Sequence, residues 1–315
     1  MGRVVACGLA TLDVVQRVAA VPGPNDKIVA RGLLVESGGP AANAAVMAVA
    51  LGVGARLVTR VGGGPLGRLV AADLAALGVE VMDLAGPDDA PALSTVLVTE
   101  GTGERAVVSV NATTAAGRVP TGAEVAAALA GATAVLVDGH HLDLAVPVAA
   151  TARCLGIPVL LDGGSWKPGL GALLTHVDVA VVSADFAVPA DARPGGGGAG
   201  DVLADVASFG PRVVARSAGA GPIEVLTGAG RATVPVPAVT VVDTLGAGDV
   251  LHGALAAWLA TRGMGGGADT RGAGPGPMPG LAFAAEVASA SCASEGARGW
   301  LAGALRRWRE VLAAR

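Results

Sequence analysis

Short apolar runs alternate with amphipathic stretches along most of this chain, and this alternation limits the possible folds more than any other feature. Each run has six or seven residues, and the stretches between them carry apolar residues at helical spacing. Strands buried on both faces form such runs, and helices between them cover a parallel sheet. We therefore predict an α/β fold with a doubly wound, mostly parallel sheet. The expected strands are 3–9, 56–62, 134–139, 158–164, 177–183 and 212–218, and the expected helices are 40–52, 67–78, 123–131, 143–156 and 202–210.

Two segments interrupt this alternation and have the pattern of antiparallel strands, DKIVARGLLVES and STVLVTEGTGERAVVSV. The second contains a hairpin signal, EGTGE at 100–104. We predict from them a small β-sheet lid, formed by residues from about 13–36 and 94–111, over the main sheet. The Gly- and Pro-rich stretches 193–200 and 263–280 are expected to be surface loops.

Composition argues against several classes of protein. The chain is 52% hydrophobic with a mean hydropathy of +0.60, yet no uninterrupted run of apolar residues reaches the ~18–20 residues of a membrane helix. A net charge of −4 provides no basic surface for nucleic acid. Three widely spaced cysteines, Cys7, Cys154 and Cys292, favour reduced thiols in the cytoplasm, and the first apolar run leads directly into Asp13, unlike a signal peptide. We expect one cytoplasmic α/β domain over residues 1–315, without nucleic-acid or membrane partners.

The stretch that says most about chemistry is VVDTLGAGDVLHGALAAWLA, residues 241–260. The turn Gly246-Ala247-Gly248 precedes Asp249, where an Ala/Leu-rich helix begins. Backbone N–H groups at a helix start attract anions, and glycines let a phosphate approach the backbone closely. A carboxylate there repels a phosphate, but it suits a base that takes the proton from an attacking hydroxyl. A lone Asp at this place is more often an N-cap, whereas the surrounding D-T-x-G-A-G-D favours the base.

Four motifs resemble those of one enzyme family. Residues 243–249 resemble the C-terminal signature of the ribokinase (PfkB) family of sugar kinases, and SGGPAAN at 37–43 resembles its first Gly-Gly motif. Residues 58–79 resemble the segment that follows, and TGERAVV at 102–108 resembles the lid hairpin. The motifs span essentially the whole chain in the family's order. Within the family, GGPAAN, LLDGG and VSADF are most similar to ketohexokinases and bacterial sulfofructose kinases.

The resemblance implies a ribokinase-like fold and an ATP-dependent transfer of the γ-phosphoryl group to a hydroxyl of a small sugar, a ketose. Asp249 would be the general base, and the backbone of Gly246, Ala247 and Gly248 would stabilise the phosphoryl group. Mg²⁺ would bridge the ATP phosphates, mostly through water. A second copy of the chain would pair with the apolar lid and form a homodimer. The residues implied to contact the sugar are Asp13, Gly38, Gly39, Asn43 and Asn111.

Several positions depart from the family pattern. Asp185, in SADF, stands where the family has Asn-x-x-Glu linked to Mg²⁺, and would substitute for it. Arg216 replaces a Thr near the ATP phosphates, and of the adjoining glycine pattern only Gly221 remains. The arginine either pairs with phosphate or weakens nucleotide binding. Gly63-Gly64 replaces an Asp-Asp that contacts the sugar. Two further positions, Ala288 and Cys292, are implied to line the adenine side of the nucleotide site. Asp243 and Leu245 are implied to lie where a monovalent cation such as K⁺ binds.

Three alternatives stay open. A nucleoside kinase of the same family would want an apolar or aromatic pocket near the lid, but the chain has no Tyr and no Phe in the lid. A non-catalytic sugar or nucleotide sensor would account for the departures at Arg216 and Gly63, yet it has no need of Asp249. An oxidoreductase would use the G-x-G-x-x-G match at 62–67, which is a weak signal among 49 glycines.

Two smaller features have competing interpretations. His140 and His141 follow an expected strand end, where ligands gather in α/β folds, but a polar loop is an equal explanation. Arg105 is expected to pair with Glu104 or Glu100 on the surface of the hairpin, because such surface pairs are common.

Overall fold

The computed structural model describes residues 2–86, 89–110, 118–194, 200–264, 278–303 and 305–314. Its larger sheet contains β1 (Arg3–Cys7), β4 (Gly54–Thr59), β5 (Glu80–Asp83), β8 (Ala134–Val137), β9 (Val159–Gly163), β10 (Val179–Val182), β11 (Val213–Ala218), β12 (Gly221–Thr227) and β13 (Gly230–Val234). The strand order is β13-β12-β11-β10-β9-β8-β1-β4-β5. All neighbours pair in parallel except β11 with β12 and β12 with β13, which are antiparallel.

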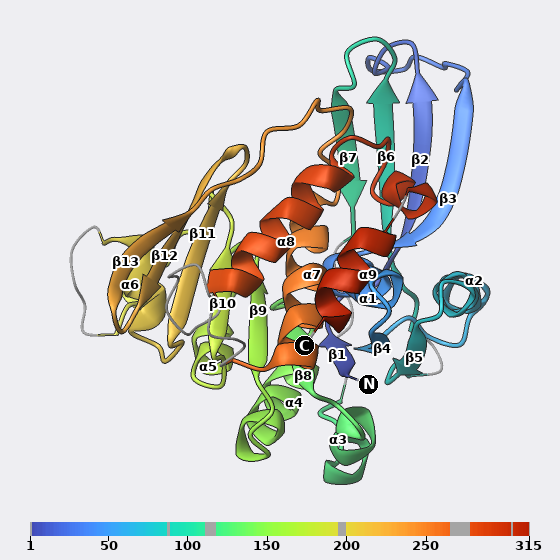
Figure 1. Ribbon diagram of the computed structural model, residues 1–315. Coiled ribbons are helices and arrows are strands. Elements are labelled where there is room, and N and C mark those ends of the chain that lie inside the picture. Colours follow the sequence, from blue (N-terminus) through green and yellow to red (C-terminus); the bar gives the residue numbers. More distant parts are fainter. Residues whose placement is uncertain are drawn as a thin grey trace.

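Helices cover both faces of this sheet, as Figure 1 shows. Val4 and Ala6 of β1 belong to one buried cluster, and Val5 and Cys7 belong to the other, as the alternation of side chains along a strand requires. The doubly wound α/β sheet predicted from the apolar runs is confirmed. The first face carries α1 (Pro40–Ala50), α2 (Pro65–Ala76), α7 (Ala247–Arg262), α8 (Met278–Ser291) and α9 (Arg306–Ala313); the second carries α3 (Gly122–Leu129), α4 (Leu142–Cys154), α5 (Leu170–Leu174) and α6 (Val202–Ala207).

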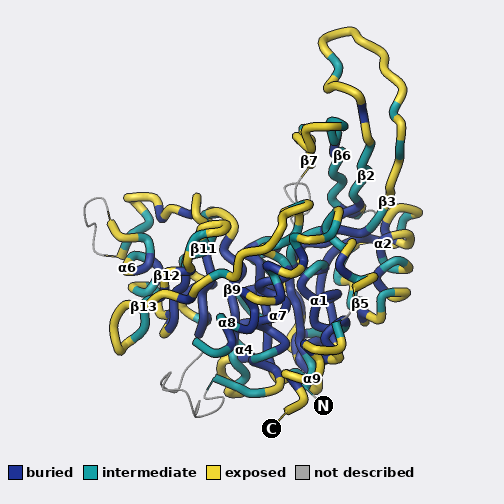
Figure 2. Tube along the Cα trace, turned by 45° about the horizontal axis from the view of Figure 1, so that its top comes forward, coloured by how far each residue is buried: buried dark blue, intermediate teal, exposed yellow. Residues whose placement is uncertain are grey.

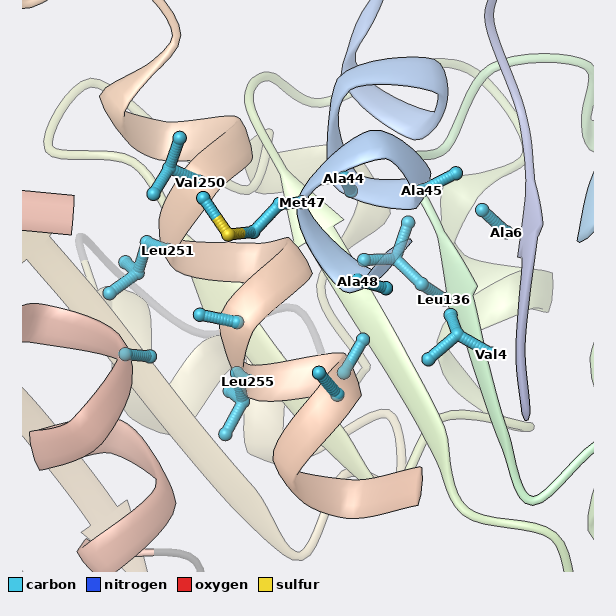
Figure 3. Packing of buried hydrophobic residues seen from close by; sticks show 14 of the residues in the cluster. Val4, Ala6, Ala44, Ala45, Met47, Ala48, Leu136, Val250, Leu251 and Leu255 are labelled. Atoms are coloured by element: carbon cyan, nitrogen blue, oxygen red, sulfur yellow. The ribbon is translucent and has the colours of Figure 1, made fainter. Parts of the chain in front are cut away.

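Helices α1 and α7 pack closely, with small side chains and Met47 between them (Figure 3). Gly253 of α7 makes this approach possible, because a Cβ there would lie 2.5 Å from the carbonyl oxygen of Ala44 and 2.8 Å from Cβ of Met47. The two helices therefore begin side by side. This packing brings Asn43, in the first turn of α1, to Asp249, in the first turn of α7.

A four-stranded sheet stands on the main body, at the top of Figure 1. It contains β2 (Thr11–Val18), β3 (Gly32–Gly38), β6 (Ala92–Thr99) and β7 (Arg105–Ser109), in the order β3-β2-β6-β7. The small sheet was predicted, with two differences. The first expected strand, within 26–37, begins only at Gly32, and the sheet is mixed because β2 and β6 run parallel. The exposed connection between β2 and β3 extends beyond the sheet (Figure 2).

Some expectations fall outside the described residues. Asn111 is among these, as are most of the loops expected at 193–200 and 263–280. Of the helices that the structure describes, none has the length and apolar character to cross a bilayer.

Candidate active site

The order of the main sheet reverses between β1 and β8, and Asp138 lies at this point, directly after β8. Ligands of open α/β sheets bind beyond the carboxyl ends of the strands at such a reversal. One carboxylate oxygen of Asp138 accepts hydrogen bonds from the amides of Leu9 (2.8 Å) and Ala41 (3.2 Å), and the other accepts from His140 (2.9 Å). Asp138 thus joins the end of β1 to the start of α1 and forms the floor of the site.

Asp249 lies in the first turn of α7, and Gly246, with a left-handed φ of 74°, occupies the N-cap position. Asp249 is therefore not an ordinary N-cap residue. Its Oδ2 accepts a hydrogen bond of 2.7 Å from Nδ2 of Asn43. Burial and the nearby charge of Asp162 raise the pKa of Asp249 to about 7, although the bond from Asn43 lowers it. A carboxylate with this pKa can accept and release a proton near neutral pH.

Arg298, which follows α8, fixes the orientation of Asn43. Its Nε and Nη2 donate to Oδ1 of Asn43 at 3.1 and 3.0 Å, which leaves Nδ2 of Asn43 to face Asp249. Its Nη1 donates to Oγ of Ser37 (3.0 Å) and to Oδ2 of Asp73 (3.2 Å). The Arg298 side chain is 8% exposed, so these bonds are shielded from water. No motif in the sequence pointed to Arg298 or Asp73.

Polar side chains gather where the small sheet meets the body. Asp13 of β2 lies in register between Glu36 of β3 and Ser94 of β6, and Thr11 donates a hydrogen bond of 2.7 Å to its carboxylate. Burial raises the pKa of both Asp13 and Glu36. Paired oxygen acceptors on one sheet face suit the hydroxyl groups of a polyol. Sequence analysis found Asp13 but neither Glu36 nor Ser94.

The glycine pair Gly38-Gly39 connects β3 to α1 beside these residues. A Cβ on Gly38 would overlap the carboxylate of Asp13. Gly39 has a φ of 97°, and a Cβ there would lie 2.5 Å from the carbonyl oxygen of Leu9. The predicted Gly-Gly turn is thus required by close packing at both positions, and it brings Asp13 and Asn43 to one place.

A largely apolar cavity of about 320 Å³ borders the turn Gly246-Ala247-Gly248 (the GAG turn). Ala247 and Gly248 of the turn line it, together with Ala288 and Cys292 of the segment that includes α8. The structure therefore brings the two positions predicted to contact adenine next to the predicted phosphoryl-binding turn.

Arg216 directly precedes Ser217, which lines this cavity. Arg216 donates a hydrogen bond to the carbonyl oxygen of Ala184, which places its guanidinium beside the turn that contains the exposed Asp185. Gly221 begins β12, next to Ala220 on the cavity wall. The departures at Arg216 and Asp185 thus lie close together, whereas Gly63-Gly64 lies apart from them, at the start of α2.

His252 and Asp162 form a buried pair beneath the GAG turn, which sequence analysis missed. Nδ1 of His252 lies 2.6 Å from the carbonyl oxygen of Gly248 and 3.3 Å from Oδ2 of Asp162. Its Nε2 lies 3.1 Å from the carbonyl oxygen of Val181. Each ring nitrogen of His252 thus faces a backbone carbonyl oxygen, and Nδ1 also lies within ion-pair distance of the Asp162 carboxylate. The pair supports the first turn of α7 from below.

The His140-His141 pair has separate surroundings. His141 is buried at the N-cap of α4 with a φ of 49°, and burial lowers the pKa of both histidines. Within the described part of the chain, no group of three or more His, Cys, Asp or Glu side chains could hold a metal ion.

Asp243 begins the turn that leads into α7, and each of its carboxylate oxygens has a partner. Oδ1 accepts from the amide of Leu245 at 2.9 Å and pairs with Arg105 of β7. Oδ2 accepts from the amide of Gly296 at 2.9 Å. The expected surface pair of Arg105 with Glu104 or Glu100 is thus wrong for this conformation, because the arginine reaches across to the body.

Comparison with known proteins gives the family. The model of the pfkB family of carbohydrate kinases matches residues 1–301. A protein from Agrobacterium tumefaciens, provisionally assigned as a ribokinase, is 25% identical, with a TM-score of 0.77 over 99% of this chain and 97% of the other. Arabidopsis thaliana ribokinase, solved with ribose and ATP, is 19% identical, with a TM-score of 0.74 over 100% and 99% of the two chains.

A fructokinase from Xylella fastidiosa, solved with ATP, is similarly related in fold. It is 20% identical, with a TM-score of 0.69 over 94% of this chain and 93% of that one. The predicted ribokinase-like fold, with its parallel sheet and small second sheet, is confirmed by these likenesses. The match along nearly the whole length shows that this chain belongs to the pfkB family of carbohydrate kinases, which are phosphotransferases with an alcohol group as acceptor.

Proposed function

We propose that this protein transfers the γ-phosphoryl group of ATP to a hydroxyl group of a small carbohydrate, a ketose, with Asp249 as general base. One observation carries the proposal. On one side, Asp249 contacts Asn43, toward the polar residues where the small sheet meets the body. On the other side, its neighbours Ala247 and Gly248 line the apolar cavity. A base at this junction can meet a sugar hydroxyl from one compartment and a phosphoryl group from the other.

In the proposed reaction, the sugar hydroxyl gives its proton to a carboxylate oxygen of Asp249. The sugar oxygen forms a bond to the γ-phosphorus, the bond between that phosphorus and the β–γ bridging oxygen breaks, and ADP leaves with the bond's electrons. The amides of Gly246, Ala247 and Gly248 lie at the start of α7, where the helix dipole favours the negative charge of the transferring group. The pKa of about 7 for Asp249 matches the task, because the base must be ionised to accept the proton.

The sugar is proposed to bind where β2, β3 and α1 meet. Asp13 and Asn43 would accept and donate hydrogen bonds to its hydroxyl groups, and the Gly38-Gly39 turn would let the sugar ring approach the backbone. Asn111 stays a prediction from the resemblance alone. Preference for a ketose rests on the ketohexokinase-like motifs GGPAAN, LLDGG and VSADF.

The nucleotide is proposed to bind in the 320 Å³ cavity, with adenine against Ala288 and Cys292. Arg216 would pair with phosphate oxygens, and Gly221 would keep β12 close to them. Mg²⁺ fits this end of the site because it prefers phosphate oxygens, water and few carboxylates, and Asp185 offers one exposed carboxylate there. When bound, the ion would neutralise phosphate charge.

Three further proposals concern the whole chain. Residues 1–315 are proposed to act as one α/β domain with its lid. The free cysteines agree with a cytoplasmic location. A second copy of the chain would cover four of the large apolar side chains that the lid exposes, and sedimentation at micromolar concentration tests this homodimer. These residues are Ile28, Val29, Leu33 and Leu34.

The deciding experiment follows ADP release with ATP, Mg²⁺ and a panel of ketoses, aldoses and nucleosides. One ketose is expected to drive turnover, and Asp249→Asn is expected to reduce kcat by ~10²–10⁴, the effect of removing a general base. Asp191→Asn, the same change in an exposed turn, serves as the control. Turnover with a nucleoside alone would show a nucleoside kinase. Ligands that raise the melting temperature without any turnover would show a sensor on a kinase fold.

A further inference from the structure

In the part of the chain that the structure describes, two ion pairs connect the lid to the body, and their partners on the body lie in different segments. Arg105 of β7 pairs with Asp243, which begins the turn into α7, whereas Arg17 of β2 pairs with Glu295, beyond α8. Both arginines lie on the lid face that carries Asp13. Residues 13 and 17 are four positions apart on β2 and therefore point to the same face. Arg17 pairs with Val98 of β6, which in turn pairs with Arg105 of β7, so Arg105 shares that face. The lid thus touches the body beside the site in two places, one of which is on the GAG segment.

Burial separates the two pairs. The side chains of Arg105 and Asp243 are 26% and 12% exposed, whereas those of Arg17 and Glu295 are 51% and 61% exposed. An exposed pair contributes little because water screens it. A shielded carboxylate that loses its cation keeps a desolvated charge, which is costly.

Asp243 also organises the backbone around the turn. One oxygen receives the Leu245 amide and the other receives the Gly296 amide, while the backbone N–H of Asp243 donates to the carbonyl oxygen of Cys292 at 3.1 Å. Burial raises the pKa of Asp243, but the bonds from Arg105, Leu245 and Gly296 outweigh it and hold the pKa below its usual value. The carboxylate is thus ionised and bridges the GAG segment, the segment after α8 and the lid.

We propose that Arg105 is a positioning residue that acts through Asp243. From the lid it supplies the positive charge that holds the Asp243 carboxylate in place, and so it orders the amides of the turn that receive the phosphoryl group. This inference rests on the proposed kinase function. It means that the turn is fully ordered only when the lid lies against the body, and that the charge on Asp243 is balanced from within the chain.

The response to a monovalent cation should distinguish the wild type most clearly from a variant without Arg105. The family resemblance implies such an ion at Asp243 and Leu245, but the guanidinium of Arg105 already balances Asp243. Removing the guanidinium leaves a shielded carboxylate that a cation from solution can approach. The native enzyme is then indifferent to K⁺, and loss of Arg105 makes it dependent on K⁺.

The first test compares the wild type with Arg105→Gln, Arg105→Lys and Arg17→Gln, in K⁺ and in choline at equal ionic strength. Wild type and Arg17→Gln are expected to have the same kcat in both salts. Arg105→Gln should lose about tenfold or more in kcat in choline, with the KM of ATP little changed, and recover part of it in K⁺. Arg105→Lys, which keeps the charge, should lose less. A wild type that needs K⁺, or an Arg105→Gln variant that behaves like Arg17→Gln, overturns the proposal.

A second test needs no activity and so separates this inference from the kinase proposal. Hydrogen exchange of the amides of residues 244–248 is measured for wild type, Arg105→Gln, Asp243→Asn and Arg17→Gln. Faster exchange by about tenfold is expected in Arg105→Gln and in Asp243→Asn, with no further increase in the double variant, and none in Arg17→Gln. Equal exchange in all variants refutes the positioning role, whether or not any sugar is phosphorylated.

Discussion

Removing the hydrogen bond from Asn43 should shift the pH dependence of the reaction in a direction that the geometry fixes. Nδ2 of Asn43 donates to Asp249 at 2.7 Å and favours its charged form, against a pKa already raised to about 7. A hydrogen bond to a charged group contributes ~1.5–3 kcal/mol, and one pKa unit corresponds to ~1.36 kcal/mol. Because water partly replaces the lost donor in Asn43→Ala, we expect a rise of about one unit, to about pH 8.

The base must be ionised to act, so kcat/KM of the wild type should fall as pH decreases through about 7. With a pKa near 8, the Asn43→Ala base is about one-tenth ionised at pH 7, whereas that of the wild type is half ionised. The ratio of wild-type to variant kcat/KM should therefore grow about fivefold between pH 9 and pH 7, beyond any constant factor from lost sugar contacts.

The assay measures ADP release directly across pH 6–9.5. A plot of kcat/KM for the sugar against pH then gives the pKa of the base in the free enzyme. Ser94→Ala is the control, because Ser94 lies beside Asp13 on the sugar side and has no bond to Asp249 in the described structure. Its loss should be the same at every pH. If kcat/KM of Asn43→Ala fell over the same acidic pH range as that of the wild type, Asn43 would not control the pKa of Asp249. Its role would then be limited to sugar binding.

Three other variants test separate parts of the structure. Gly253→Val should lower stability by ~1–3 kcal/mol or more, read as Tm, because its side chain enters the α1–α7 contact at the Ala44 carbonyl; an unchanged Tm would contradict this packing. Ala288→Phe should fill the cavity and raise the KM of ATP by about tenfold or more while the KM of the sugar stays constant; equal effects on both would place adenine elsewhere. Asp249→Asn should raise Tm by about 2–4 °C at pH 8, because the raised pKa of Asp249 makes its ionised form costly to the folded state above pH 7. This gain in Tm should shrink as the pH falls below the pKa of Asp249. A gain that persists at pH 4 would contradict the assignment.

Local patterns in the sequence located most of the fold, for a physical reason. Central parallel strands such as β9 are buried on both faces and form continuous apolar runs. The strands β5, β12 and β13 lie at or near the sheet edges and carry exposed polar residues, so their runs did not stand out. The parallel pairing of β2 with β6 depends on contacts between distant segments, which no local pattern records.

The same distinction applies to the candidate site. Asp249, Asn43 and the Gly38-Gly39 turn were predicted because each lies in a motif of adjacent residues, but the bond from Asn43 to Asp249, 206 positions away, was not predicted. Arg298 was missed because it acts on Asn43 across 255 positions in the sequence. His252 was missed because its partner Asp162 lies on β9, far away in the sequence, and a histidine inside an apolar helix gives no sign of such a partner.

The parallel pairing of β2 with β6 has a consequence for the order in which the chain folds. Residues 11–18 pair with residues 92–99, about 80 positions along the chain, so the entropy cost of closing this loop precedes any contact between the strands. The main sheet closes a longer loop where β1 pairs with β8, so the stability of the lid depends on the surface that it buries. The lid sheet also has little buried surface of its own. We therefore expect the lid sheet to form late, on a body that is already assembled, and its amides should be the first to lose protection in mild denaturant. Because Asp13 lies on this sheet, the sugar site proposed around it would be complete only when folding ends.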